Sequence, residues 1–307
     1  MILQQLHSQI ALVEDISQYL ATGGGKRVRP LVVLLVASAL DDADDPRQIQ
    51  LATAIEFLHT ATLLHDDVVD VSMLRRGRPT ANANWGNAPS VLVGDFVYSR
   101  AFQLMVAVGD LAVMGVLSDT TVKIAEGEVQ QLAEIGNLQL DEKTYYDVIE
   151  RKTAQLFAGA CESAALVAGA NDNVAEAMRH YGRHLGLAFQ LVDDYLDYAG
   201  EADKLGKNVG DDLAEGKLTL PLIQALKLTE HTDPDAHAAL ADAIRQKDVG
   251  KISTVIEIVQ NCAALQYTLN AAQHQSELAA EQLQALPDTP SRAALAELST
   301  FIVQRRS

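Results

Sequence analysis

Apolar residues recur every three or four positions along most of the chain, which is the spacing of α-helices that bury one face. No stretch alternates apolar and polar residues over the length of a strand, and no Asn-Gly pair marks a hairpin. Clusters of glycine, proline and aspartate interrupt the pattern. The segments between these clusters predict helices over residues 30–40, 49–69, 91–108, 111–135, 145–168 and 175–198.

The end of the chain carries a signal for one more helix. Thr289 precedes Pro290, and a threonine followed by a proline is typical of an N-cap and the first helical position. We therefore expect a last helix over residues 290–304. No linker of low-complexity composition divides the chain, so residues 1–307 are expected to form one all-α domain.

Composition narrows the class of partner. Hydrophobic residues make up 48% of the chain, enough for a substantial core, and the formal net charge is −17. Such a charge repels nucleic acid and anionic lipid, so neither is an expected partner. The acidic cluster at residues 41–45, beside Pro46, is interpreted as a solvated loop.

Location is predicted from the pattern of the first residues and from the cysteines. Residues 1–20 do not combine a basic segment with an apolar block, as a signal peptide would. The longest apolar run, residues 31–40, is about half a membrane span. Cys161 and Cys262 lack metal-ligand spacing and are interpreted as reduced thiols. We expect a cytoplasmic protein without stable membrane insertion.

An aspartate motif of the form D-D-x-x-D closes the apolar segment 49–69. It consists of Asp66, Asp67 and Asp70. Its first and last positions lie about one helical turn of 5.4 Å apart on one face. Carboxylates this close repel each other unless a cation intervenes, and Mg²⁺ prefers oxygen ligands and bridges to phosphate oxygens.

The same motif closes the apolar segment 175–198, as Asp193, Asp194 and Asp197. A solvated helix end explains one such motif equally well. Two copies, each near basic residues, favour a metal site. Facing each other across a helical bundle, they would clamp a diphosphate through several Mg²⁺ ions.

Cations stand where a polyanion would bind. Glycines 23–25 free the backbone, and Lys26 and Arg29 follow at the start of a predicted helix, which is typical of an anion site. Basic residues that only decorate a loop would give the same pattern. His59 lies two turns before Asp66 on the same face, which favours a functional histidine over a structural one.

Taken as a set, these residues resemble the trans-isoprenyl diphosphate synthase family, and within it the long-chain (octaprenyl-type) synthases that supply quinone side chains. The resemblance covers about residues 20–300 in the family's order and spacing. The matching stretches are G-G-G-K-R-V-R-P at 23–30, H-T-A-T-L-L-H-D-D-V-V-D at 59–70, R-R-G-R-P-T-A-N at 75–82, V-G-D-F at 93–96, R-K-T-A-Q-L-F at 151–157, F-Q-L-V-D-D-Y-L-D-Y at 189–198 and G-K-N-V-G-D-D-L-A-E-G-K at 206–217.

The resemblance implies how two substrates are bound. An isopentenyl diphosphate site would comprise Lys26, Arg29, His59 and Arg76. The six motif aspartates would bind two to three Mg²⁺ ions and, through them, the allylic diphosphate. Contacts to that second diphosphate would come from Arg75, Lys152, Thr153, Gln190, Lys207 and Lys217. The family also implies a homodimer and a helical bundle around a deep central cavity.

The implied reaction is a sequential 1′-4 condensation. Loss of the allylic diphosphate leaves a carbocation, the isopentenyl double bond attacks it, and a proton is then lost. The released diphosphate is the expected base, and Lys152, Thr153 and Gln190 are its expected electrostatic partners in catalysis. An octaprenyl diphosphate grown from farnesyl diphosphate is the expected product, within a range of seven to ten isoprene units.

Small residues below the first motif set the expected chain length. Ala61 and Thr62 lie about one turn below Asp66, and Leu58 continues the wall. An aromatic residue at either of the first two positions would stop growth early. Gly182 and Gly186 are expected to thin the opposing helix. The alternative is that all these small residues simply allow helices to pack closely.

Three other classes share part of this pattern. A terpene cyclase needs no second diphosphate site, so Lys26, Arg29 and His59 argue against it. A metal phosphohydrolase would use His65 beside Asp66 but needs further histidines with ligand spacing. A non-catalytic subunit of a heteromeric synthase should lose aspartates from one motif, whereas both are intact. The synthase is therefore favoured.

Overall fold

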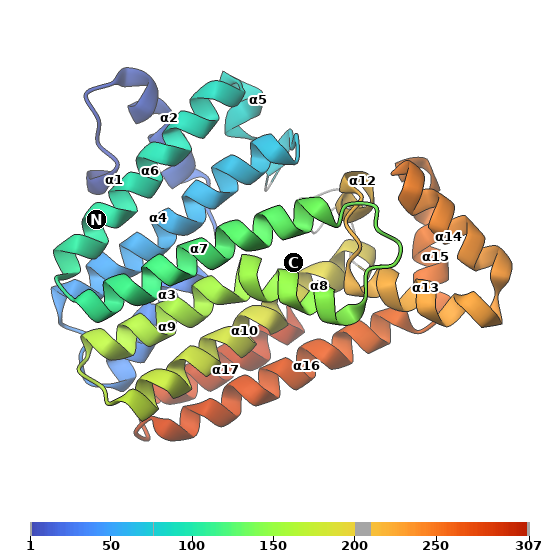
Figure 1. The fold of residues 1–307 in the computed structure, drawn as a ribbon. Coiled ribbons are helices and arrows are strands. Elements are labelled where there is room, and N and C mark those ends of the chain that lie inside the picture. Colours follow the sequence, from blue (N-terminus) through green and yellow to red (C-terminus); the bar gives the residue numbers. More distant parts are fainter. Residues whose placement is uncertain (1, 76, 200–209, 306–307) are drawn as a thin grey trace. The chain divides into compact units, whose positions relative to one another are not determined.

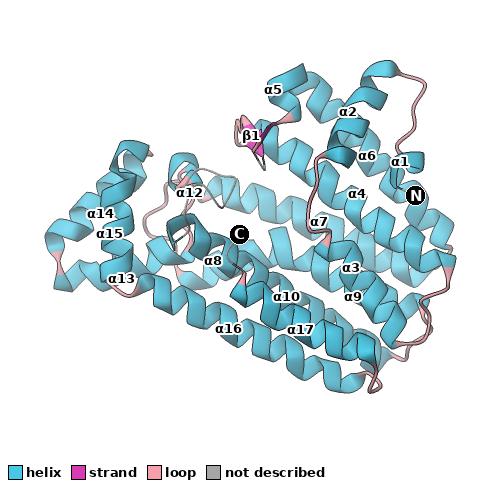
Figure 2. Cartoon of the chain, turned by 180° about the vertical axis from the view of Figure 1, so that it is seen from behind, coloured by secondary structure: helices cyan, strands magenta, loops and turns pink. Residues whose placement is uncertain are grey.

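The structure is a computed structural model that describes residues 2–75, 77–199 and 210–305. Two residues of the predicted sites, Arg76 and Lys207, lie outside this described part of the chain. Helices account for nearly all of the regular structure in Figure 2. The predicted all-α class is confirmed.

The chain forms two compact units, each assembled from three stretches of sequence. Unit 1 comprises Met1–Asp119, Gly159–Arg179 and Gln284–Leu295. Unit 2 comprises Thr120–Ala158, His180–Leu283 and Ala296–Ser307. The prediction of a single domain over residues 1–307 stays a prediction.

Unit 1 is built around a long buried helix, α4, which packs against α3, α5 and α6 (Figure 1). Residues 51–58 of α4 are all buried. A helix that is buried on every side in this way belongs to a core rather than a surface. The helices that begin in the first stretch of unit 1, Met1–Asp119, are α1 (Ile2–Gln5), α2 (Ala11–Thr22), α3 (Val28–Ala39), α4 (Pro46–Val69), α5 (Ala81–Trp85), α6 (Asn87–Val108) and α7 (Leu111–Ala133).

The start of α4 corrects the interpretation of residues 41–45 as a merely solvated loop. Asp45 is the N-cap of α4, and its carboxylate accepts a hydrogen bond from the Arg47 amide at 2.8 Å. Pro46 occupies the first helical position. Asp42 accepts a hydrogen bond from the side chain of buried Gln48 at 2.8 Å. These aspartates fix the helix start and so the direction in which α4 carries the first motif.

A short hairpin follows α4 and was not predicted. Its strands, β1 (Leu74–Arg75) and β2 (Arg78–Pro79), pair antiparallel, with Leu74 opposite Pro79 and Arg75 opposite Arg78. Gly77 has φ +71°, a conformation that favours glycine and allows the tight turn. With only two residues in each strand, it lacks the alternation that marks a longer strand.

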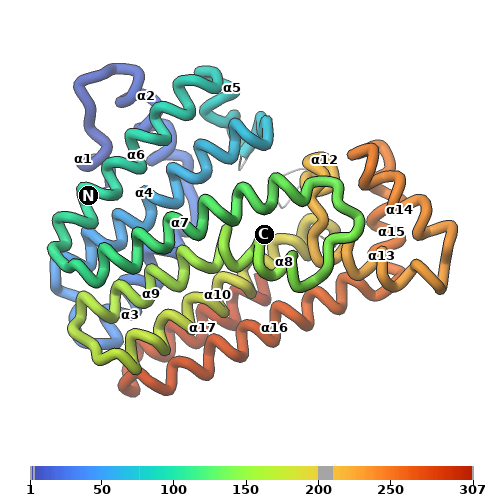
Figure 3. The backbone as a smooth tube through the Cα atoms, viewed as in Figure 1, coloured from blue at the N-terminus to red at the C-terminus, as the bar shows by residue number. Residues whose placement is uncertain are grey.

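Unit 2 has its core where α13 packs against α14, α15 and α16, a group that Figure 3 shows together. Buried leucines and alanines of these helices join Tyr145, Leu191 and Leu196 in one apolar cluster. The remaining helices are α8 (Glu142–Ile149), α9 (Gln155–Val167), α10 (Asp172–Ala199), α12 (Asp211–Glu215), α13 (Leu220–Thr232), α14 (Pro234–Gln246), α15 (Ile252–Asn261), α16 (Ala264–Gln282) and α17 (Pro290–Gln304). Short 3₁₀ turns occur at Val249–Lys251 and Leu283–Ala285.

The predicted helix over residues 145–168 is interrupted by a π-helical turn, Glu150–Ala154, between α8 and α9. Two glycines of α10 lie against its C-terminal side. A Cβ atom on Gly186 would come within 2.5 Å of Ala154 Cα, and one on Gly182 within 2.3 Å of the Phe157 carbonyl oxygen. These contacts support close packing, one of the two roles that the sequence left open for these glycines.

The last predicted helix is confirmed in detail. α17 spans Pro290–Gln304, and the Arg292 amide donates to the Thr289 hydroxyl at 3.1 Å, as an N-cap requires.

By length and composition, one helix in the described part of the chain, α6, could cross a membrane. The core helices of many globular proteins meet the same criterion. In this structure α6 packs along α4 and buries Val93, Val97 and Ala101, which indicates a core helix.

Candidate active site

The first aspartate motif lies at the C-terminal end of α4, where the middle carboxylate turns inward. Asp67 is only 4% exposed, whereas Asp66 and Asp70 are half-buried. The Asp67 carboxylate accepts hydrogen bonds from Arg75 Nε and Nη2, both at 2.7 Å. Asn82 of α5 donates to the Asp67 carbonyl oxygen at 3.1 Å. Arg75, predicted as a diphosphate contact, is thus already held on the motif by the hairpin.

Burial and nearby charges together make the neutral form of the Asp67 carboxyl group more favourable than it is in water. Burial is the largest cause and raises its pKa, the Arg75 guanidinium opposes that rise, and Asp66 and Asp70 add to it. A bound cation near this helix end would relieve both the burial penalty and the repulsion.

The glycine turn and the middle of α4 bring two predicted isopentenyl diphosphate residues together. Arg29 Nη1 lies 3.2 Å from His59 Nε2. Arg27, in the left-handed region at φ +51°, forms an ion pair with the buried carboxylate of Glu56, one turn before His59. This ion pair ties the turn to α4, and it leaves Lys26 exposed at the turn.

The residues predicted to set chain length lie on the same helix. Leu58 and Ala61 are fully buried, and the Thr62 hydroxyl donates to the His59 carbonyl oxygen at 2.9 Å. Their effect on product length stays a prediction.

His65 is engaged by α6. Its Nε2 atom lies 3.3 Å from the Val91 carbonyl oxygen and 3.3 Å from an Asp95 carboxylate oxygen. A Cβ atom on Gly94 would come within 2.5 Å of the His65 ring, so glycine at this position allows the contact. The imidazole therefore packs between helices, which argues against the His-Asp metal pair of a phosphohydrolase.

The second aspartate motif lies at the C-terminal end of α10, and its first and last members have close partners. Arg305 Nη2 lies 2.6 Å from Asp193 Oδ1 and 2.7 Å from the Phe189 carbonyl oxygen, and its guanidinium stacks 4.0 Å from the Phe189 ring centroid. The Asp212 amide donates to Asp197 Oδ2 at 3.2 Å, which ties the motif to the start of α12.

The middle aspartate of this motif sits in a chain of hydrogen bonds. Thr153 Oγ1 donates to Gln190 Oε1 at 2.8 Å, and Gln190 Nε2 donates to Asp194 Oδ1 at 2.8 Å. Tyr145 Oη donates to the other oxygen, Asp194 Oδ2, at 2.5 Å. The structure thus brings together the predicted residues Thr153, Gln190 and Asp194.

The predicted lysines have carboxylate or amide neighbours in unit 2. Lys152 Nζ lies 2.7 Å from Glu128 Oε2 and 2.8 Å from Gln131 Oε1, both on α7. Lys217 Nζ lies 2.5 Å from Glu215 Oε2. Each of these ammonium groups thus has a carboxylate partner, and a lysine that binds an anion must share or leave that partner.

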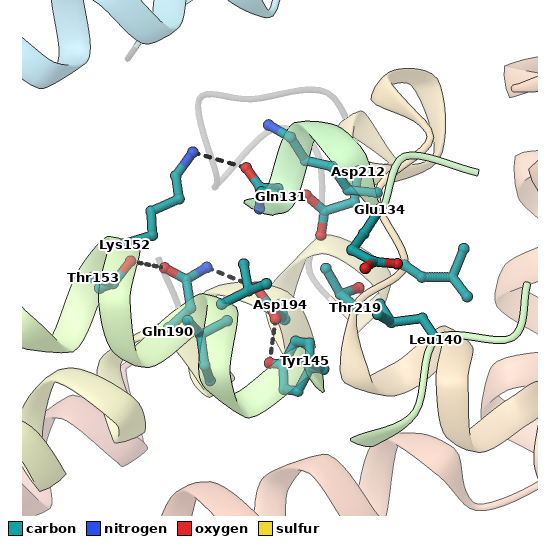
Figure 4. Close-up of a pocket in the computed structure, with 14 residues that line it drawn as sticks. Gln131, Glu134, Leu140, Tyr145, Lys152, Thr153, Gln190, Asp194, Asp212 and Thr219 are labelled. Carbon is teal, nitrogen blue, oxygen red and sulfur yellow. Dashed lines mark hydrogen bonds between the residues drawn. The ribbon is translucent and has the colours of Figure 1, made fainter. Parts of the chain in front are cut away.

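A cavity of about 110 Å³ opens among these groups (Figure 4). Lys152, Thr153, Gln190 and Asp194 line it together with Tyr145 and Asp212. Apolar walls come from Leu140, Val148, Ile149 and Leu218. The cavity lining thus combines a cation, an amide and carboxylates with apolar side chains.

Electrostatics single out Asp194 among the six aspartates. Burial, followed by repulsion from Asp212, raises its pKa to about 8, although Tyr145 and Gln190 donate to it. The pKa of the Tyr145 hydroxyl is raised well above its ordinary value by burial and by the same carboxylate. Tyr145 therefore remains a hydrogen-bond donor at any physiological pH.

The carboxylates fit a metal that is completed by its substrate. Within the described residues, no group of three or more His, Cys, Asp or Glu side chains is arranged to hold a metal ion alone. Mg²⁺ commonly takes one or two protein carboxylates and fills its shell with water and phosphate oxygens. Half-buried oxygen donors such as Asp66, Asp70 and Asp193 match that requirement.

Sequence reasoning missed several residues of this site. Tyr145 and Arg305 gave no signal, because neither belongs to an aspartate motif or a basic cluster near it. Glu128 and Gln131 stand one turn apart in an acidic helix and were indistinguishable from a solvated face.

The chain is similar to known proteins over most of its length. A family model described as polyprenyl synthetase matches residues 10–260. The octaprenyl diphosphate synthase of Escherichia coli (strain K12) is 46% identical over 306 residues, covering 99% of this chain and 93% of the relative. The all-trans-nonaprenyl-diphosphate synthase (geranyl-diphosphate specific) of Rhodobacter capsulatus is 44% identical, covering 98% of this chain and 91% of the relative.

A solved structure shows the same fold. The polyprenyl synthase from Caulobacter crescentus CB15, crystallised with calcium and isoprenyl diphosphate, superposes with a TM-score of 0.94 at 42% identity. The match covers 100% of this chain and 93% of that one.

The chain belongs to the polyprenyl synthetase family. It is a prenyltransferase that elongates trans-prenyl chains, and the family uses a divalent metal and isoprenyl diphosphate substrates. The predictions of family and enzyme class are confirmed. The roles of individual residues, the identity and number of metal ions, and the homodimer stay predictions.

Proposed function

We propose that this chain is an octaprenyl diphosphate synthase that uses Mg²⁺ and extends farnesyl diphosphate with isopentenyl diphosphate. The observation that carries the proposal is the hydrogen-bonded set of Thr153, Gln190 and Asp194 beside Lys152, at the wall of one cavity. Such a set offers donors and cations to a diphosphate and a carboxylate to its metal. The 46% identity to the octaprenyl diphosphate synthase supports the product length.

In this proposal unit 1 binds isopentenyl diphosphate. Arg29 and His59, whose side-chain nitrogens lie 3.2 Å apart, share one anion, and exposed Lys26 adds a mobile cation. Arg76 completes the predicted set but lies outside the described residues. The Arg27–Glu56 ion pair holds the glycine turn in place for this contact.

The allylic diphosphate is bound by the second set. Oxygen ligands for two to three Mg²⁺ ions come from the six motif aspartates: Asp66, Asp67, Asp70, Asp193, Asp194 and Asp197. When bound, Mg²⁺ supplies the positive charge that stabilises the leaving diphosphate. From unit 2, Lys152, Thr153 and Lys217 contact that diphosphate, and Gln190 fixes the Thr153 hydroxyl. Arg75, on the hairpin, is a further predicted contact. Lys207 completes the predicted set outside the described residues.

The proposal includes a homodimer in the cytoplasm that supplies a quinone side chain. Support for the dimer comes from α6, on which Leu92 and Val106 are 67% and 64% exposed. Two large apolar side chains exposed on one helix favour burial against a second copy. Sedimentation velocity of the purified chain tests this part, and a single monomeric species contradicts it.

Product analysis tests the function. The purified chain is incubated with Mg²⁺, isopentenyl diphosphate and farnesyl diphosphate, and the dephosphorylated products are sized by mass spectrometry. A dominant octaprenyl alcohol supports the whole proposal. A product no longer than geranylgeraniol contradicts the chain length, whereas no elongation by folded protein contradicts the function. Asp242→Asn, on exposed α14, is the matched control that keeps full activity.

A further inference from the structure

Tyr145 of α8 is buried beside the second aspartate motif and has no role in the reaction described so far. Its side chain is 3% exposed, and its hydroxyl lies 2.5 Å from Asp194 Oδ2 (Figure 4). Burying a hydroxyl costs free energy unless it is hydrogen-bonded, and here the acceptor is a carboxylate rather than a neighbouring carbonyl.

The hydroxyl completes a fixed arrangement around Asp194. Gln190 donates to one carboxylate oxygen and Tyr145 to the other, so the carboxylate cannot rotate about its Cβ–Cγ bond without breaking one of the two bonds. In its ionised form, the form that binds a cation, the carboxylate has about four acceptor positions, so each oxygen then keeps one for a further partner. The remaining lone pairs therefore point in directions set by α8 and α10.

The fixed arrangement extends from Asp194 to Gln190 and Thr153. Because Gln190 donates through its amide nitrogen to Asp194, its carbonyl oxygen must face Thr153, whose hydroxyl donates to it at 2.8 Å. Thr153 stands on the π-helical turn next to Lys152. Tyr145 thus anchors one end of a chain that reaches the residues proposed to hold the diphosphate.

We propose that Tyr145 is a positioning residue of the prenyl transfer site, which holds Asp194 and, through Gln190, the Thr153 hydroxyl in the orientation that receives a metal-bound diphosphate. The inference rests on the proposed function. Its claim is that the phenol hydroxyl acts on the affinity for metal and diphosphate and on turnover. The fold needs only the ring, which packs in the core of unit 2.

The chain offers a matched control. Tyr146 is the next residue of α8, its ring packs edge-on against that of Tyr145 at 5.6 Å, and it points about 100° away around the helix. Tyr145→Phe and Tyr146→Phe each remove one hydroxyl from the same helix. Only the first removes a donor to Asp194.

The test compares these variants by Mn²⁺ binding in the presence of inorganic diphosphate, followed by electron paramagnetic resonance, and by steady-state kinetics. In Tyr145→Phe we expect the Mn²⁺ dissociation constant to rise about tenfold and kcat to fall about tenfold, as for other groups that orient metal ligands. The KM for isopentenyl diphosphate and the thermal unfolding midpoint should stay close to those of Tyr146→Phe. In the Asp194→Asn background, Tyr145→Phe should cause no further change in binding.

A second variant keeps the test decisive. Replacing Tyr145 by 4-aminophenylalanine keeps the ring and a hydrogen-bond donor, and we expect it to bind Mn²⁺ within about threefold of the unchanged protein. Mn²⁺ binding by this variant as weak as that of Tyr145→Phe overturns the inference. So does Tyr145→Phe binding and turning over like Tyr146→Phe. If the unchanged protein itself neither binds Mn²⁺ with diphosphate nor elongates, the proposed function fails, and the inference fails with it.

Discussion

Both aspartate motifs read D-D-x-x-D and lie at the C-terminal end of a helix, but their middle carboxylates have different neighbours. In unit 1, Asp67 at 4% exposure faces a guanidinium, that of Arg75. In unit 2, Asp194 at 3% exposure accepts hydrogen bonds from two neutral donors, Tyr145 and Gln190. Burial raises the pKa of both carboxyl groups. At Asp67 the Arg75 guanidinium opposes the rise, whereas at Asp194 repulsion from Asp212 adds to it and the pKa reaches about 8. The repeated motif thus fixes the position of each carboxylate along its helix, whereas the neighbouring groups determine the pKa of that carboxylate.

The difference also suggests how the two helix ends are made ready for a cation. Arg75 compensates the first motif permanently, because a guanidinium stays charged at every relevant pH. The second motif holds its middle carboxylate with neutral donors, and Arg305 supplies a cation at Asp193. The Arg305 side chain is only 6% exposed, so removing it alters the motif itself.

The largest expected effect comes from the first aspartate of each motif. Asp66→Ala and Asp193→Ala should each reduce elongation by about 10³-fold, since each removes a proposed ligand of the catalytic metal, which supplies several kcal/mol to the barrier. Elongation rates under saturating Mg²⁺ are the measurement. A loss confined to one variant would break the functional equivalence of the two motifs. Circular dichroism of both variants confirms the fold.

The next largest effect is on the free energy of unfolding, and it distinguishes Asp67 from Asp194. Arg75→Met should lower the free energy of unfolding by about 2 kcal/mol, because it leaves the buried Asp67 carboxylate without its cation while partial exposure of Arg75 limits the loss. Asp67→Asn combined with Arg75→Met should recover most of it without restoring activity. Urea unfolding measures both, and Arg245→Met, in an exposed pair on α14, is the control.

The free energy of unfolding should depend on pH because of Asp194, the middle aspartate of the second motif. The pKa of Asp194 in the folded chain is about 8 against an ordinary value of 3.8, so between these values the folded state binds more protons than the unfolded state. The free energy of unfolding of metal-free protein should therefore fall as pH rises through that window, by up to about 1.4 kcal/mol per pH unit. Asp67 contributes in the same direction.

Asp194→Asn isolates this contribution. Urea unfolding in EDTA, from about pH 5 to about pH 9, should show a flatter profile for the variant than for the unchanged chain. Equal slopes would mean that Asp194 ionises normally and that the contrast with Asp67 is wrong.

The smallest effect on rate is expected from Ala61→Phe, because this substitution changes only the apolar wall below the first motif. The first condensation should proceed within about twofold of the normal rate, because no ligand or cation is touched, while the product becomes shorter. Mass spectrometry of the dephosphorylated product is the readout. Ala52→Phe, nine residues earlier on α4 and also buried, controls for overpacking of the helix. An unchanged product length would remove Ala61 from the chain-length residues.

The fold was predictable where one helix carries its own signals. The end of α4 at Val69 and the start of α17 at Pro290 were predicted to the residue. The start of α4 was missed because Asp45 and Pro46 were interpreted as a loop, although an aspartate before a proline is also an N-cap signal. The π-helical turn at Glu150–Ala154 was missed because its residues have ordinary helical propensities and only packing against α10 shows the need for it.

The sequence by itself determined which residues of this protein carry chemistry. Six aspartates at two helix ends, with a glycine turn and flanking cations, are a local pattern, and helical geometry alone places the members of each motif on adjoining positions. Only the tertiary structure decided what each carboxylate does. The partners of Asp67 and Asp194 come from a hairpin, from α8 and from the preceding turn of α10. Burial and hydrogen bonding depend on such neighbours, and for this reason the middle carboxyl groups of two identical motifs have different partners.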